Sequence, residues 1–346
     1  MKILYASQLS PNDSALYRQW ALERLGHTVI PFNLLDYRSH NSLLQKLEFR
    51  TQMGPNVTRL DRDLLNLAAT EKPDVFWADK LLSLRPETLQ QMRAQGIRTI
   101  SYMIDNAFGP RRDPGWRLYM KCIPFFDLHA VQRDKNIADY NARGARNVIK
   151  IQTAFEPTIN FPAPSDFFSA ESDSVRNRGV SFIGTPYDNR AEFLTRLWRD
   201  FKLPVVISGN GVWRKHLAPD AAAALYTGSE LFNADYRETI WRSKINLSFL
   251  THSNEDEFAH KSFEIAACGG FLLAERSTGH AARFVEDEEA VFFTGIEECA
   301  AKISRYLPDT AARERIAAAG HARAVRDGYD NDTQVSRILT RLAEIS

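Results

Sequence analysis

Residues 260–275, HKSFEIAACGGFLLAE, constrain the fold of this chain more than any other stretch. Their small and apolar side chains predict a short helix packed against a sheet, and Gly269 and Gly270 provide the left-handed geometry that ends a helix. Residues 271–274 then predict a short buried strand of a parallel sheet. Glu264 stands out because carboxylates are seldom buried without a partner. A pair of sugar hydroxyls, such as those of a ribose, would suit it; a capping or surface glutamate is the alternative.

Strand and helix patterns alternate along the whole chain, which predicts an α/β protein with parallel sheets. The expected strands are residues 3–6, 28–32, 74–78, 98–104, 127–131, 148–152, 180–183, 205–208, 245–249 and 271–274. The expected helices are residues 15–25, 60–69, 86–94, one ending near 143, 190–201, 236–242, the helix described above and two that close the chain.

A stretch rich in Pro, Ser, Asp and Asn separates two series of strands and helices. It divides the chain into an N-terminal Rossmann-like domain (residues 1–155), a linker (156–179) and a C-terminal Rossmann-like domain (180–346), whose last helix can pack back on the first domain. Two open α/β domains are expected to bind ligands where their strands end at the carboxyl side.

Composition excludes several classes of protein. The 346 residues carry a net charge of +1, which argues against a dedicated nucleic-acid binder. Cys122, Cys268 and Cys299 are scattered, so we expect reduced thiols and no cysteine metal site. No stretch has the roughly 20 apolar residues of a membrane-spanning helix, and the N-terminus reads as a strand rather than a signal peptide. We therefore expect a cytoplasmic protein.

Residues 260–275 resemble the donor-site motif of GT-B glycosyltransferases, in which a Glu-Ala-x-Ala-x-Gly helix follows a loop at the nucleotide diphosphate. They resemble more closely the CgeB-like, spore-maturation-type group, whose pattern is Arg-x-Phe-Glu-Ile-x-Ala-Cys-Gly-Gly-Phe-x-Leu, with Lys261 in place of the arginine. The similarity continues through residues 283–284, 290–293, 315–320 and 326–329. It implies two Rossmann-like domains that face each other across a cleft. The implied activity is transfer of a sugar from a nucleotide-diphosphate donor to a hydroxyl, with retention of anomeric configuration, in polysaccharide or glycoconjugate biosynthesis.

The loop after strand 180–183 is the first candidate for donor binding. Gly184 and Thr185 lead into a helix whose N-terminus can bind a phosphate, and Arg190 in its first turn can add charge-assisted hydrogen bonds. The resemblance assigns Gly184 and Arg190 to this role; an ordinary turn with a surface arginine is the alternative. Gly209 and Asn210 after the next strand can hold the nucleotide base through backbone groups, and a plain turn explains them equally well.

A second group of candidates precedes Glu264. Retaining GT-B enzymes often hold the donor sugar with a glutamate eight residues earlier, and Asp256 occupies that position here; a solvated acidic loop is the alternative. Lys261 lies near the N-terminus of the helix and can balance the charge of the departing diphosphate. His260 can do the same, or it can be a packing or capping residue.

The acceptor side is expected in loops of the first domain, among them Gln8 to Ser10, Asp79-Lys80 and Gln132-Arg133. Asp105 follows the fourth strand and can act as a base on an acceptor hydroxyl; an Asx turn or a helix cap is the alternative. Basic and aromatic residues within 111–121 can line a site for an anionic or sugar acceptor, or form a solvated helix face. A saccharide, a lipid-linked molecule and a protein hydroxyl all remain open as acceptor.

Catalysis in this hypothesis depends on Arg190, Lys261 and the base Asp105. The two cations and a helix N-terminus are in place before reaction and would stabilise the departing diphosphate. Such an arrangement can replace a divalent metal, so we expect no metal and no cofactor besides the nucleotide-sugar co-substrate, a UDP-sugar first. Two alternatives remain: a non-catalytic sugar-nucleotide-binding or scaffold protein, and a GT-B-fold sugar-nucleotide epimerase.

Overall fold

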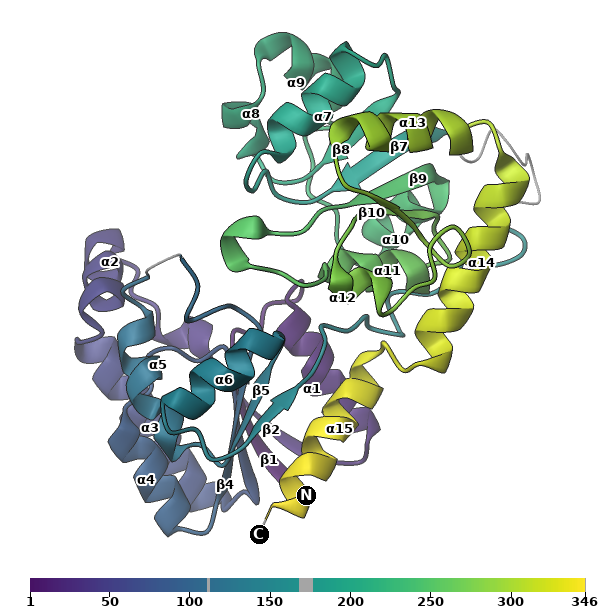
Figure 1. Ribbon diagram of the computed structural model, residues 1–346. Coiled ribbons are helices and arrows are strands. Elements are labelled where there is room, and N and C mark those ends of the chain that lie inside the picture. The colour runs from purple at the N-terminus through teal and green to yellow at the C-terminus, as the bar shows by residue number, and fades with distance from the viewer. Residues whose placement is uncertain (111–112, 168–176, 346) are drawn as a thin grey trace. The chain divides into compact units, whose positions relative to one another are not determined.

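The computed structural model describes residues 1–110, 113–167 and 177–345, which form two compact units (Figure 1). Residues 1–152 and 331–345 form the first unit, and residues 153–330 form the second. Both are built around a parallel β-sheet. The expected α/β class with two parallel sheets is therefore confirmed.

The first unit has a six-stranded sheet in the order β2-β1-β3-β4-β5-β6. Its strands are β1 (Lys2–Ser7), β2 (Thr28–Asn33), β3 (Val75–Asp79), β4 (Arg98–Met103), β5 (Leu128–Val131) and β6 (Val148–Lys150). Its helices are α1 (Ser14–Arg24), α2 (Ser42–Thr51), α3 (Pro55–Glu71), α4 (Pro86–Ala94), α5 (Trp116–Cys122), α6 (Asp134–Ala142) and α15 (Asn331–Glu344).

Apolar residues alternate between the two faces of this sheet, as the period of a strand requires. Ile3 and Tyr5 of β1 share a core with α1 and with Ile338 of α15, whereas Leu4 lies in the opposite core with α3 and α4. In Figure 1 the yellow helix α15 lies beside α1, although about 300 residues separate the two helices in the sequence, and the pair forms many contacts. The C-terminal helix is therefore part of the first unit.

The second unit has a five-stranded sheet in the order β11-β10-β9-β7-β8. Its strands are β7 (Arg178–Ile183), β8 (Val205–Ser208), β9 (Ser243–Ser248), β10 (Leu272–Glu275) and β11 (Val291–Phe293). Its helices are α7 (Arg190–Arg199), α8 (Trp213–His216), α9 (Pro219–Leu225), α10 (Asn233–Arg242), α11 (His260–Ala267), α12 (Thr278–Ala281), α13 (Ile296–Tyr306) and α14 (Thr310–Arg326).

Several elements differ from the sequence-based expectation. Three helices close the chain instead of two, and α2, α8, α9, α12 and β11 were not expected, whereas α5 matches the helix that residues 111–121 offered as an alternative. Residues 153–167 pack on the second unit: the Phe155 N–H donates to Tyr329 O at 3.0 Å and Trp241 Nε1 to Phe161 O at 3.0 Å. This part of the chain lies in the stretch expected as boundary and linker, and its aromatic side chains explain why it packs. Residues 168–176 of the expected linker lie outside the described residues.

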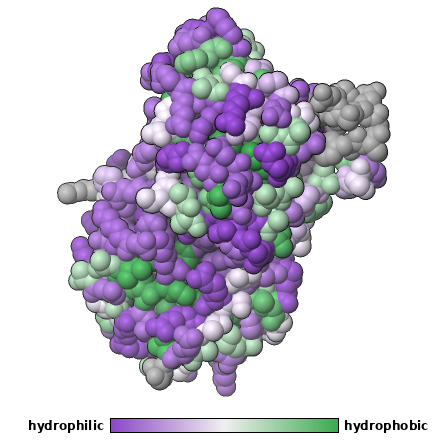
Figure 2. Space-filling model, turned by 45° about the vertical axis from the view of Figure 1, so that its right-hand side comes forward, coloured by the Kyte–Doolittle hydropathy of each residue, from purple (hydrophilic) through white to green (hydrophobic). Residues whose placement is uncertain are grey.

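No helix in the described part of the chain is both long enough and apolar enough to cross a membrane. Figure 2 shows a surface composed mainly of hydrophilic residues, with smaller hydrophobic areas between them. Large hydrophobic side chains are nevertheless exposed at several positions, four of which lie within residues 43–53.

Candidate active site

A pocket of about 320 Å³ lies in the second unit, where β7, β8 and β9 end and α11 begins. Eight of the ten predicted site residues line it: Gly184, Thr185, Arg190, Gly209, Asn210, Asp256, His260 and Lys261. Glu264 lies one turn further along α11. Asp105 belongs to the first unit, so this pocket does not include it.

Two glycines let the loops after β7 and β8 approach each other closely. A Cβ on Gly209 would lie 2.1 Å from Gly184 O, an impossible contact. The Gly209 N–H donates to Ser229 O, and the Tyr226 hydroxyl is 2.9 Å from Gly209 O and 3.0 Å from Asn210 O. The backbone of Gly209 is thus already hydrogen-bonded within the protein. Its role in the structure is to allow this close approach.

Arg190 is a buried cation at the start of α7, with 7% of its surface exposed. Its guanidinium donates to Thr185 O at 3.1 Å, Leu250 O at 2.9 Å and Thr251 Oγ1 at 3.0 Å. Within the described residues it forms no ion pair, and Nε has no hydrogen-bond partner. Burial lowers the pKa of the guanidinium, and the carboxylates around it only partly oppose this shift. Arginine nevertheless stays charged in proteins, so the pocket carries a positive charge that the surrounding carboxylates compensate only in part.

Lys261 brings a second cation to the pocket from the first turn of α11. Its ammonium lies 4.7 Å from the centroid of the Tyr236 ring, a cation–π contact. Burial lowers the pKa of Lys261; the charge of Glu264 opposes this shift and the charge of Arg190 adds to it. No side chain caps the N-terminus of α11. The positive end of this helix and two cations therefore converge on one pocket, which favours a ligand with several negative charges.

Glu264 is a largely buried carboxylate whose side chain is 15% exposed. The Tyr236 hydroxyl donates to Oε2 at 2.7 Å, and His260 Nε2 lies 3.5 Å from Oε1. Burial alone would raise the pKa of Glu264, but His260, Lys261 and the Tyr236 hydroxyl together lower it below its usual value. The carboxylate is therefore ionised near neutral pH.

The remaining predicted residues also form contacts inside the second unit. Asp256 Oδ1 accepts from Asn254 Nδ2 at 2.8 Å, a hydrogen bond between two side chains of one loop. His260 Nε2 donates to Ala154 O at 2.9 Å, so this side chain also ties the stretch around residue 154 to α11. Both residues line the pocket while they perform these structural roles.

His280 contacts the start of α11 and was not predicted as a site residue. Its Nδ1 donates to Glu275 O at 2.7 Å, so Nε2 is an acceptor. That nitrogen accepts from the Ala259 N–H at 3.1 Å and lies 3.0 Å from Ser262 Oγ. Burial lowers the pKa of His280 to about 4. Neutral His280 thus holds the residue that precedes the first turn of α11.

Sequence reasoning also missed Tyr236, Tyr187 and Phe232. Tyr236 contacts both charged residues of α11, and Tyr187 and Phe232 line the pocket while remaining 50% and 41% exposed. Tyr236 lies in a predicted helix, but nothing in the sequence links it to a carboxylate 28 residues later. The other two lie in loops, where no periodic pattern marks a function.

Asp105, the predicted base, forms an ion pair in the first unit. Its Oδ2 lies 2.9 Å from Lys80 Nζ, and the two side chains are 40% and 41% exposed. Arg111 and Arg112 of the predicted basic stretch lie outside the described residues. Among the described side chains, no group of three or more His, Cys, Asp or Glu is placed to hold a metal ion.

Comparisons with known proteins agree with this geometry. Residues 190–340 match a family model described as glycosyl transferase-like. No curated protein sequence matches the chain.

Solved structures resemble the chain over its whole length. Sucrose-phosphate synthase from Thermosynechococcus elongatus has a TM-score of 0.70 at 12% identity, with 100% of both chains covered. HepE of Anabaena in complex with UDP-glucose has a TM-score of 0.68 at 16% identity, with 99% of both covered. Trehalose-6-phosphate synthase from E. coli bound with UDP-2-fluoro glucose has a TM-score of 0.68 at 14% identity, with 100% of both covered. At such identities the likeness shows the fold. The chain therefore has the fold of the GT-B glycosyltransferases, and its residues 190–340 match the glycosyl transferase-like family model.

Proposed function

We propose that this chain transfers a sugar from a UDP-sugar to a hydroxyl acceptor, with retention of configuration and without a divalent metal, as a member of the CgeB-like group. One observation carries the proposal: Arg190, Lys261 and the uncapped N-terminus of α11 converge on a single pocket. HepE and the E. coli synthase, which share the fold, were solved with UDP-glucose and UDP-2-fluoro glucose, and this supports a UDP-sugar donor.

The pocket offers a distinct group to each part of such a donor. The diphosphate would lie between the two cations and the N-terminus of α11. The ribose would donate a hydroxyl hydrogen to Glu264 Oε1, the oxygen that Tyr236 leaves open. The base would lie against the loop at Asn210 and the exposed ring of Phe232, and Asp256 would accept from a sugar hydroxyl.

In the reaction the bond between the anomeric carbon and the diphosphate oxygen breaks while a bond to the acceptor oxygen forms. Negative charge develops on the departing diphosphate, and Arg190 and Lys261 would stabilise it there. Because both cations are fixed before the reaction, they need little reorganisation as the charge develops. Asp105 is the proposed base for the proton of the acceptor hydroxyl.

The test is turnover of UDP-sugars with a panel of hydroxyl acceptors, read as UDP release and as product by NMR. Transfer that survives a metal chelator and gives a product with the anomeric configuration of the donor supports the proposal. Binding of UDP-sugar without hydrolysis or transfer would instead identify a scaffold. Conversion of the donor without an acceptor would identify an epimerase, and an inverted product would refute retention.

A further inference from the structure

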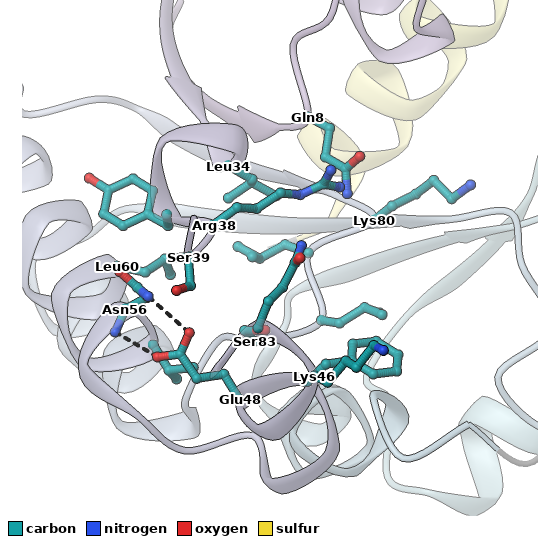
Figure 3. A pocket seen from close by; sticks show the side chains of 16 residues that line it. Gln8, Leu34, Arg38, Ser39, Lys46, Glu48, Asn56, Leu60, Lys80 and Ser83 are labelled. Carbon is teal, nitrogen blue, oxygen red and sulfur yellow. Dashed lines mark hydrogen bonds between the residues drawn. The ribbon is translucent and has the colours of Figure 1, made fainter. Parts of the chain in front are cut away.

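A second pocket, of about 440 Å³, lies entirely within the first unit (Figure 3). It lies where three neighbouring strands end: Gln8 follows β1, residues 34–39 follow β2, and residues 80–83 follow β3. The order β2-β1-β3 means that the chain changes direction across the sheet between β1 and β3. Parallel α/β sheets bind ligands outside the carboxyl ends of their strands at such a point.

The pocket is positively charged. Arg38, Lys46 and Lys80 line it, and Glu48 is the one carboxylate among its described lining residues. Both oxygens of Glu48 are engaged by Asn56, whose N–H and side-chain amide each donate at 2.9 Å (Figure 3). Lys80 pairs with Asp105, but no ion pair involves Arg38 or Lys46 in the described part of the chain. Two cations are thus left for an anionic ligand.

Lys80 also has an unusual backbone. Its φ is 53°, a left-handed conformation that non-glycine residues rarely adopt and that is frequent at functional sites. Through its ion pair, this residue connects the pocket to Asp105, the proposed base.

Apolar side chains form much of the rest of the pocket wall: Leu34, Tyr37, Phe49, Val57, Leu60, Leu81 and Leu82. Outside the pocket, α2 exposes Leu43 and Leu47 by 74% and 56%. Leu43 lies three residues before Lys46 and four before Leu47, so these three side chains share one helix face. These exposed leucines leave an apolar surface beside the pocket that the apolar chain of a ligand can cover. A hexose phosphate would satisfy the cations but leave this apolar surface uncovered.

We propose that this pocket binds the acceptor, and that the acceptor is an anionic amphiphile with a hydroxyl group. Its charged group lies between Arg38 and Lys46, and its apolar chain lies along the hydrophobic wall and over Leu43 and Leu47. The role of the amphiphile as acceptor rests on the proposed glycosyl transfer; its binding does not.

The experiment titrates the full chain with octyl phosphate, below the concentration at which it forms micelles, by calorimetry. Inorganic phosphate, glucose 6-phosphate and octanol are titrated in parallel. We expect octyl phosphate to bind at least about tenfold more tightly than each of these, since charge-assisted hydrogen bonds and apolar burial act together. Arg38→Gln and Lys46→Gln should each weaken it about tenfold. The double variant Leu43→Gln/Leu47→Gln should weaken octyl phosphate but not inorganic phosphate.

Arg62→Gln is the matched control, because Arg62 is an exposed cation of the first unit that does not line the pocket. Equal effects of Arg62→Gln and Arg38→Gln would overturn the proposal, since they would indicate general charge attraction. Glucose 6-phosphate binding as tightly as octyl phosphate would also overturn it. UDP titrated into the same protein separates the two proposals: UDP binding without octyl phosphate binding refutes only this one, and the reverse refutes the donor site.

Discussion

Protonation of His280 should loosen the start of α11, and the structure sets how much free energy of unfolding is lost. The pKa of this buried imidazole is lowered to about 4, against 6.5 for an exposed histidine. Between these values the unfolded chain binds a proton that the folded chain does not, so stability is full above pH 6.5 and falls as the pH falls. The free energy of unfolding is thereby lowered by about 2 kcal/mol at pH 5 and by about 3 kcal/mol at pH 4.

His280→Gln removes the titrating group. Between pH 7 and pH 5 the free energy of unfolding of this variant should therefore fall by about 2 kcal/mol less than that of the wild type. A chain of two units need not unfold in one step, so the probe must be local. Hydrogen exchange of the residue 260–267 peptide in increasing urea, corrected for the intrinsic exchange rate at each pH, reports on α11 itself. His216→Gln, at an exposed histidine of the same unit, is the control and should behave like the wild type.

Parallel pH dependence of wild type and His280→Gln would refute this reasoning. It would mean that water or a rearranged side chain solvates the imidazolium in the folded state. An equal effect of His216→Gln would likewise show that the loss is not specific to the buried ring.

The structure predicts the effects of three further substitutions. Asp79→Asn leaves the buried guanidinium of Arg18, now 2.6 Å from the carboxylate, without its counter-charge, and should cost about 3–5 kcal/mol in chemical denaturation. Gly209→Ala should abolish UDP binding in calorimetry, because the added Cβ would collide with the backbone. Gly211→Ala is the control and should bind UDP normally, because no atom lies within 4 Å of its added carbon. Equal affinities of the two variants would refute the argument that Gly209 is needed for close approach. Tyr236→Phe removes the hydrogen bond that orients the site carboxylate and should weaken UDP about fivefold; unchanged affinity would remove the carboxylate from the ribose site.

Elements with a regular apolar pattern were predictable from the sequence. Strand 205–208 and helix 86–94 appear with the predicted bounds, because a short apolar run and a Pro-to-Gly interval mark their ends. Helix α2 was missed for the opposite reason. Leu43, Leu47 and Phe49 face solvent and its one buried residue is Glu48, so no apolar periodicity marks it. The proposed acceptor pocket explains why these apolar side chains of α2 are exposed.

The candidate donor site was predictable in part. Glycines and charged residues at strand ends indicated the loops that the structure brings together, because parallel strands end at one edge of a sheet. Partners far along the chain were not predictable: the contact of Tyr236 with Glu264 and the bonds of Arg190 to residues 250 and 251 exist only in the folded unit. The first-unit pocket was visible only as separate candidates, Gln8 and Lys80.

The most direct test of the donor site is calorimetric titration of UDP, GDP, ADP, dTDP and CDP into wild type, Lys261→Gln and Glu264→Gln, with Arg199→Gln as control. Arg199 is an exposed arginine of α7 paired with Asp220, outside the pocket. We predict that UDP binds most tightly, that both site variants weaken it at least about tenfold, and that the control binds like the wild type. If no nucleotide binds, or if both site variants bind as well as the control, the pocket is not a donor site and the proposed function is wrong.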